Sequence, residues 1–182
     1  MLRSVVLPLL LVGLAIGGLG LALWLLRSPE PSYAGLYLGS TLPRVQAQLE
    51  ENGGELRCRT LPWTHLTDCT WSGTLPTLSV TPVEIRITAD QRHRVLGEIR
   101  IEHALPPGTS AEEWMQQVLR QWGAVGGTPE REPTALKFTI QRPRAQSGYR
   151  GASARVEEST GRIVVVLFDT TIIAHAAEPG RA

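Results

Sequence analysis

An uncharged run at the N-terminus is the feature that most constrains this chain. Val5 to Leu26 covers 22 residues without a charged side chain, and Arg3 and Arg27 bracket it. As a helix that rises 1.5 Å per residue, this run would span roughly 33 Å, enough to cross the hydrocarbon core of a bilayer. Trp24 lies near one end, where an indole suits the membrane interface. We therefore expect a transmembrane anchor over residues 1–27.

A cleaved signal peptide is the competing interpretation of this segment. The apolar region of a signal peptide is normally about 7–15 residues long and ends in a small-x-small site. Here the run is longer, and its best such triplet, Gly20-Leu21-Ala22, lies inside it. No cysteine lies near the segment, which excludes lipoprotein processing. These criteria favour an uncleaved anchor.

Small residues are spaced along one side of the predicted anchor. Gly13 and Gly17 form a GxxxG pair, and Gly20 extends the same face. Small residues at this spacing let a second membrane helix approach closely. Glycine is also common in membrane helices, so both a packing role and a chance arrangement stay open.

The chain has two cysteines, Cys58 and Cys69. Two short predicted strands, 55–60 and 67–72, flank a loop over 61–66, and the cysteines lie symmetrically about it. In an antiparallel hairpin they would face each other, as a cross-strand disulfide requires. Two free buried thiols, or half of a metal site, are the alternatives, but the spacing is not C-x-x-C and no second pair exists. A disulfide implies an oxidising compartment, so we expect the N-terminus in the cytoplasm and residues 28–182 on the periplasmic side of the inner membrane.

The remaining chain is the size of one domain. About 155 residues follow the anchor, enough to bury a sizeable core. The net charge of +1 provides no field that would select nucleic acid. A polar, proline-bearing spacer over 28–34 leads into the domain.

Two halves of this domain share a plan of one helix followed by about three strands. In the first half, residues 35–105, Ser40 or Thr41 can cap a helix of about 10 residues that Asn52-Gly53-Gly54 ends. Alternating strands follow at 80–89 and 95–103.

The second half, residues 106–176, repeats the plan before a short tail over 177–182. Ser110 and Glu113 form a capping box at the start of a second helix. Predicted strands follow at 134–141, 152–157 and 162–174. The expected fold class is α+β, an antiparallel sheet with both helices on one face.

A resemblance adds to this expectation. The segment from Gly39 to Leu49 has the form G-x-T-x-x-x-V-x-x-x-L. It resembles the helix opening of small outer-membrane assembly lipoproteins and of the β-lactamase-inhibitor-protein-like fold. These families also use helix-then-strands units, often duplicated and often with a disulfide. The chain departs from them by lacking a lipidated cysteine. The resemblance implies protein binding without catalysis, although fold analogy alone does not establish function.

Residues that could carry chemistry are dispersed. The four histidines form no H-E-x-x-H pattern, and the chain has no G-x-S-x-G elbow and no phosphate-binding glycine loop. We therefore predict no catalytic, metal or cofactor site and no small-molecule substrate. An envelope hydrolase is the third hypothesis, and it needs a pocket that gathers His65, Asp68 or His103.

Two features could serve a protein partner. A stretch without acids holds Arg142, Arg144, Arg150 and Arg155. It is either a basic loop for an acidic partner or anionic head groups, or a solvated connection, which is the commoner case.

The last predicted strand is apolar on both faces, with Val164, Val166 and Phe168 on the second face. Two helices cover only one face of a sheet, so loops 104–109 or 123–133, or another protein, must cover these side chains. The leading hypothesis is a membrane-anchored, non-enzymatic accessory or assembly subunit that binds an envelope protein. The alternative is an exported soluble binding module or inhibitor.

Overall fold

The computed structural model describes residues 30–62, 64–78, 80, 82–92, 94–124, 126–143 and 148–177. The side chains of residues 175–177 lie outside the description. The chain divides into two units, Met1–Glu30 and Pro31–Ala182. The predicted anchor, with Gly13, Gly17 and Gly20, lies outside the described residues. Within the described ranges, no helix has the length and apolar character needed to cross a membrane.

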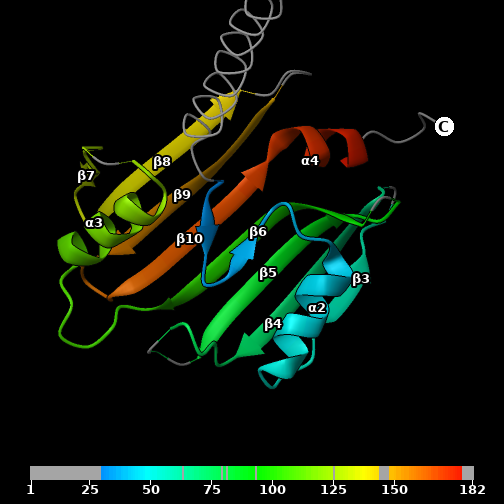
Figure 1. Cartoon of the computed structure of the whole chain (residues 1–182), viewed down its shortest axis with the longest axis horizontal. Helices are drawn as coiled ribbons and strands as arrows, with labels where there is room; N and C mark the ends of the chain where they lie inside the picture. Colours follow the sequence, from blue (N-terminus) through cyan, green and yellow to red (C-terminus); the bar gives the residue numbers. More distant parts are fainter. Residues whose placement is uncertain are drawn as a thin grey trace, which may run out of the picture. The chain divides into compact units, whose positions relative to one another are not determined.

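One eight-stranded antiparallel sheet forms the second unit (Figure 1). The first half of the chain supplies β3 (Arg57–Thr60), β4 (Leu66–Gly73), β5 (Val83–Asp90) and β6 (Val95–Ala104). The second half supplies β7 (Glu130–Glu132), β8 (Ala135–Pro143), β9 (Tyr149–Glu157) and β10 (Arg162–Asp169). The order β3-β4-β5-β6-β10-β9-β8-β7 makes the fold a mixed α+β domain with a largely antiparallel sheet, as predicted.

The two halves meet at the centre of the sheet, where β6 pairs with β10. Each half therefore runs from the edge to the centre and contributes four strands. The four of the first half match those predicted at 55–60, 67–72, 80–89 and 95–103, whereas the second half has one more than the three predicted. The missed strand of the second half is β7, which has three residues, Glu-Arg-Glu. Its charged residues carry no apolar alternation, so a periodicity test cannot detect it.

Both predicted helices are present and lie over the same face of the sheet (Figure 1). The first, α2 (Leu42–Glu51), has the predicted length of 10 residues, but the Thr41 side chain makes no capping hydrogen bond. The second, α3 (Ala111–Gln121), begins with the predicted capping box, in which Ser110 and Glu113 exchange hydrogen bonds.

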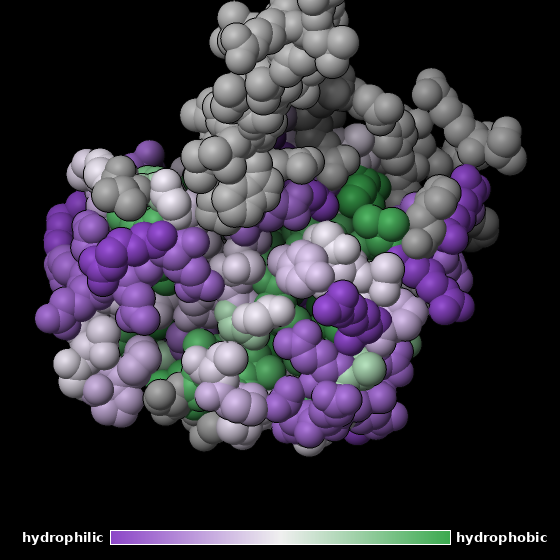
Figure 2. Space-filling model, viewed as in Figure 1, coloured by the Kyte–Doolittle hydropathy of each residue, from purple (hydrophilic) through white to green (hydrophobic). Residues whose placement is uncertain are grey.

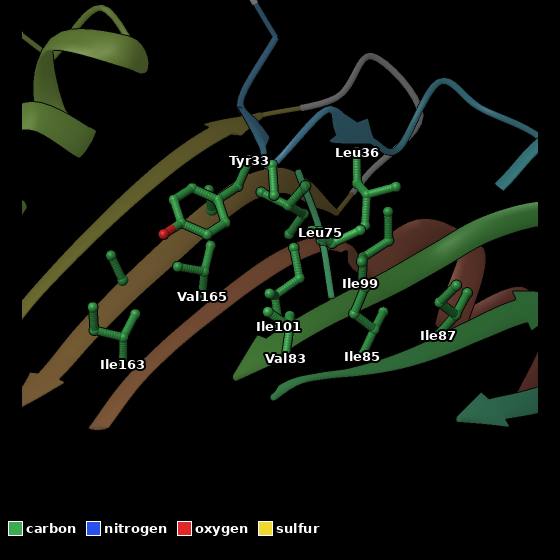
Figure 3. Close-up of a cluster of buried hydrophobic side chains, with 14 of the residues drawn as sticks. Tyr33, Leu36, Leu75, Val83, Ile85, Ile87, Ile99, Ile101, Ile163 and Val165 are labelled. Atoms are coloured by element: carbon green, nitrogen blue, oxygen red, sulfur yellow. The ribbon is translucent and has the colours of Figure 1, made fainter. Parts of the chain in front are cut away.

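The core lies between these helices and the sheet. A short hairpin, β1 (Ser32–Tyr33) and β2 (Leu36–Tyr37), also packs on this face between the helices. Figure 3 shows Tyr33 and Leu36 above the inward side chains of β5, β6 and β10. Seen from this side, polar residues cover the outer surfaces of α2 and α3, with apolar atoms between the helices (Figure 2). The buried cluster thus spans both halves of the chain.

The predicted final strand over 162–174 is wrong in its second part. Strand β10 ends at Asp169, and a third helix, α4 (Thr170–Ala177), follows. The Asp169 carboxylate accepts hydrogen bonds from the backbone amides of Thr171 and Ile172, at 3.2 and 3.4 Å. A carboxylate in this position caps a helix start, and this local bond outweighs the strand propensity of Ile172 and Ile173.

Candidate functional site

The sheet surface opposite α2 and α3 is called the open face here. Side chains alternate along each strand, so the residues between core positions point to this second face. In β5, for example, Val83, Ile85 and Ile87 are buried, whereas Glu84 and Arg86 are exposed. The open face is therefore mainly polar, which makes its few apolar side chains informative.

Those apolar side chains are Val164, Val166 and Phe168 of β10, at the centre of the sheet. Each is half-buried, whereas Ile163, Val165 and Leu167 on the core side are fully buried. The Phe168 ring lies where a side chain at Gly151 would be. The three side chains therefore share one face and form an apolar strip along β10.

An ion network borders the apolar strip. Glu102 of β6 lies opposite Val164 and accepts hydrogen bonds from Arg100 at 2.6 Å and from Arg162 at 3.1 Å. Burial alone would raise the pKa of Glu102, but the hydrogen bonds from Arg162 and Arg100 lower it below its ordinary value. This carboxylate therefore stays ionised and is already occupied by two arginines.

A groove of about 380 Å³ lies on the first half of the open face. Its polar lining comes from β3 to β6 and from the loop before β3, and comprises Glu55, Arg57, Thr70, Ser72, Glu84, Arg86, Arg100 and Glu102. Arg86 and Arg100 are direct register partners on neighbouring strands.

Helix α4 covers one end of the open face. It contacts β4, β5, β6 and β9, and it passes behind the sheet when viewed from the core side (Figure 3). Ile172 and Ile173 pack where a side chain at Gly97 would be. Burial raises the pKa of the nearby Glu98 carboxyl, although the charge of Arg100 opposes this. Helix α4 therefore covers part of the open face at Gly97, a cover that the prediction of loops 104–109 or 123–133 did not include.

The four arginines of the predicted basic loop do not form one loop in the structure. Strands β8 and β9 extend into the segment, so that Arg142 and Arg150 become register partners. Arg150 pairs with the buried Asp169 at 3.4 Å, and Arg155 pairs with Glu132 at 2.7 Å. Arg144 lies outside the described residues. The guanidinium groups of Arg150 and Arg155 are therefore engaged within the domain.

The residues required by the hydrolase hypothesis are spread over the sheet. His65 lies just before β4, near Asp90, at the end of the sheet where β6 begins with Val95. His103 lies near the other end of β6. Asp68 forms an ion pair with Arg59 at 3.5 Å on the open face, whereas His103 is on the core side. Within the described ranges, no three His, Cys, Asp or Glu residues lie close enough to hold a metal ion.

A buried histidine cluster is a feature that sequence analysis missed. His103 accepts a hydrogen bond from the Tyr33 hydroxyl at 2.7 Å when its proton is on Nδ1, which then donates to the Ala104 carbonyl at 2.7 Å. The two rings stack, and Trp114 of α3 meets both edge-on. The local sequence does not predict this role for His103, because Tyr33 is 70 residues earlier and Trp114 belongs to the second half of the chain.

The His103 cluster predicts a pH dependence of stability. Burial lowers the pKa of His103 below its ordinary value of 6.5, so the unfolded chain takes up this proton first as the pH falls. The contribution of neutral His103 to the free energy of unfolding should therefore be complete above about pH 6.5. It should decrease as the pH falls toward the pKa of His103 in the folded state. Urea unfolding at pH 7.5 and 5.5 tests this. H103Q should reduce the pH dependence, whereas H65Q should leave it intact, and an unchanged dependence in H103Q would contradict the assignment.

The predicted disulfide is present. Cys58 and Cys69 are bonded and are register partners on β3 and β4. Cys69 is fully buried, whereas all four residues of the edge strand β3 are exposed. The bond therefore attaches an otherwise weakly packed edge strand to the core.

Comparison with known proteins gives no relative for this arrangement. No protein-family model matches the chain, and no curated protein or solved structure matches it at a significant level.

Proposed function

We propose that this protein is a membrane-anchored, non-enzymatic accessory or assembly subunit. Its domain would face the periplasm and bind another envelope or membrane-complex protein through the open face. The anchor and the compartment are inferred from the sequence, the anchor from the uncharged run Val5 to Leu26 and the oxidising compartment from the paired cysteines.

One observation carries the binding proposal, namely the apolar strip at the centre of an otherwise polar sheet face. Protein interfaces commonly have an apolar centre within a polar rim. Val164, Val166 and Phe168 provide such a centre, and the network around Glu102 provides part of the rim. A solvated sheet face does not require apolar residues, so three adjacent apolar side chains on this face favour contact with a partner.

The start of the domain supports close tethering. The Ser32 carbonyl accepts hydrogen bonds from Gln121 and Trp122, both at 3.0 Å, so the chain is fixed there. Four residues lie between Arg27 and Ser32. The five steps from one to the other allow a reach of at most roughly 18 Å at about 3.5 Å per residue. An anchored domain would therefore contact only partners at the membrane surface, which suits an accessory subunit.

A released soluble binding module is the alternative that the same face allows. The open face would then bind its partner away from the membrane. The mature N-terminus decides between these cases, because signal cleavage would leave a chain beginning between about residues 23 and 33, whereas an anchor retains Met1.

The test is affinity purification of the tagged protein from membranes in mild detergent, with quantitative mass spectrometry. We expect one complex of fixed stoichiometry. V166K should reduce its recovery about tenfold or more, because a charge at an interface centre must be desolvated and lies next to Arg100. V166T, which keeps the β-branched shape, should have a smaller effect.

Q116K, a lysine on the exposed side of α3, is the matched control and should leave recovery unchanged. Each variant is checked for folding by its urea unfolding midpoint. Full recovery of the complex with folded V166K would contradict binding through the open face.

A further inference from the structure

We propose that the groove on the open face binds an extended acidic segment of the partner protein, whose carboxylates are held by Arg57, Arg86 and Arg100. This inference rests on the proposed function and adds the chemistry of the partner.

The three arginines lie on one line across the sheet. Arg57 of β3 is the register partner of Thr70 in β4, Thr70 of Arg86 in β5, and Arg86 of Arg100 in β6. Guanidinium groups donate hydrogen bonds and accept none. Three donor-only side chains on four neighbouring strands therefore line the groove, and they suit a ligand that supplies acceptors.

The charges of this line are only partly balanced within the domain. Like charges directly opposite each other destabilise a sheet, and Arg86 faces Arg100. Glu102 neutralises Arg100, but it is shared with Arg162. Glu55 pairs with Arg57, where both side chains are at least three-quarters exposed, so the pair is weak. Within the described ranges Arg86 forms no direct ion pair, although the charges of both Arg86 and Arg100 act on Glu98 of β6. A carboxylate placed between Arg86 and Arg100 would add a direct partner for both.

The spacing indicates an extended peptide. Neighbouring strands lie about 4.8 Å apart, so Arg57 and Arg86 are separated by roughly 10 Å and Arg86 and Arg100 by roughly 5 Å. Alternate residues of an extended segment lie on one side, roughly 7 Å apart. A segment crossing the strands can thus place one carboxylate near Arg57 and Thr70, and the next between Arg86 and Arg100.

The same line continues into the apolar strip. Val166 of β10 is the register partner of Arg100. The third alternate residue of such a segment would reach Val166, which predicts the pattern acidic-x-acidic-x-apolar. Glu84 and Glu102 also line the groove, but they are register partners of each other, two residues along the strands from Arg86 and Arg100. A peptide with two carboxylates on the arginine line avoids this acidic pair, whereas a polyanion such as nucleic acid would also meet it, and the net charge of only +1 gives no compensating attraction.

The experiment measures binding of a labelled octapeptide, Gly-Glu-Thr-Glu-Thr-Val-Thr-Gly, to the full chain in mild detergent by fluorescence anisotropy. A peptide with both glutamates replaced by glutamine is the control. We expect the glutamate peptide to bind about tenfold more tightly at low salt, and the difference to shrink in 0.5 M salt. R86Q and R100Q should each weaken binding about fivefold or more, and R86K, which keeps the charge, should retain part of the affinity.

R131Q is the matched control, because Arg131 is an exposed arginine paired with Glu112 and Glu158 away from the groove. It should bind as the parent does. Equal affinity for the two peptides, or unchanged affinity in both folded R86Q and folded R100Q, overturns the inference.

If the complex copurifies and depends on Val166 while these arginine variants have no effect, the inference fails and the proposed function stands. If the glutamate peptide binds through Arg86 but no complex copurifies, the inference holds for the groove and the proposed function fails.

Discussion

Replacement of Asp169 by alanine should lower the free energy of unfolding by about 3–5 kcal/mol, the range typical for removing one partner of a buried ion pair. The carboxylate is fully buried, pairs with Arg150, and caps the first turn of α4. Its loss leaves the Arg150 charge without this partner and frees two helix amides. Urea unfolding of the full chain in detergent, followed by tryptophan fluorescence, measures the change.

Two further variants separate the cap from the charge. D169N keeps an oxygen that can accept from the amides of Thr171 and Ile172 but removes the charge, so hydrogen exchange in α4 should rise less than in D169A. R150M combined with D169A should recover part of the lost stability, because no buried charge then remains. E51Q, at an exposed position, should change stability by less than about 0.5 kcal/mol. A change of that size in D169A would show that the ion pair and the cap contribute little.

Asp169 also explains why the C-terminal segment was predicted wrongly. The apolar residues from Ile163 to Ile173 give a continuous pattern that favours a buried strand. What ends the strand is a buried carboxylate that is satisfied by an arginine on β9 and by two amides of the next turn. The first partner comes from strand pairing, which a linear pattern does not contain.

Features with local causes were predictable. The capping box of Ser110 and Glu113 follows from a spacing of three residues, and the disulfide from the symmetry of Cys58 and Cys69 about one loop. Alternation predicted β5 and β6, because one side of each strand is buried and the other is wet.

Features that depend on distant pairing were not predictable. Arg86 and Arg100 come together only because β5 and β6 pair in one register, and the next partner of Arg100 is Val166 from the other half of the chain. The hairpin β1–β2 consists of two two-residue strands whose stability depends on packing against the core. With only two residues in each strand, local propensity gives no signal from which the hairpin could be predicted.

Removal of the disulfide has the second large expected effect. The double variant C58A/C69A should lower the free energy of unfolding by roughly 2–3 kcal/mol, since the bond closes a loop between residues 11 apart. Alanine avoids burying a hydroxyl at Cys69, which is fully buried. Reduction of the unmodified protein should lower the urea midpoint similarly, and equal midpoints for the oxidised and reduced forms would contradict the prediction.

The loss should be largest at the edge of the sheet. Strand β3 is fully exposed and is held by four register pairs to β4 and by the disulfide. Hydrogen exchange should therefore increase first in β3, while β5 and β6 stay protected until global unfolding.

Because β3 carries Arg57, the reduced protein should also bind the glutamate peptide more weakly than the oxidised protein, whereas its affinity for the glutamine peptide should not change. Equal binding of the glutamate peptide by both forms would show that Arg57 does not need the bond to hold its position. The disulfide would thus keep one end of the groove assembled.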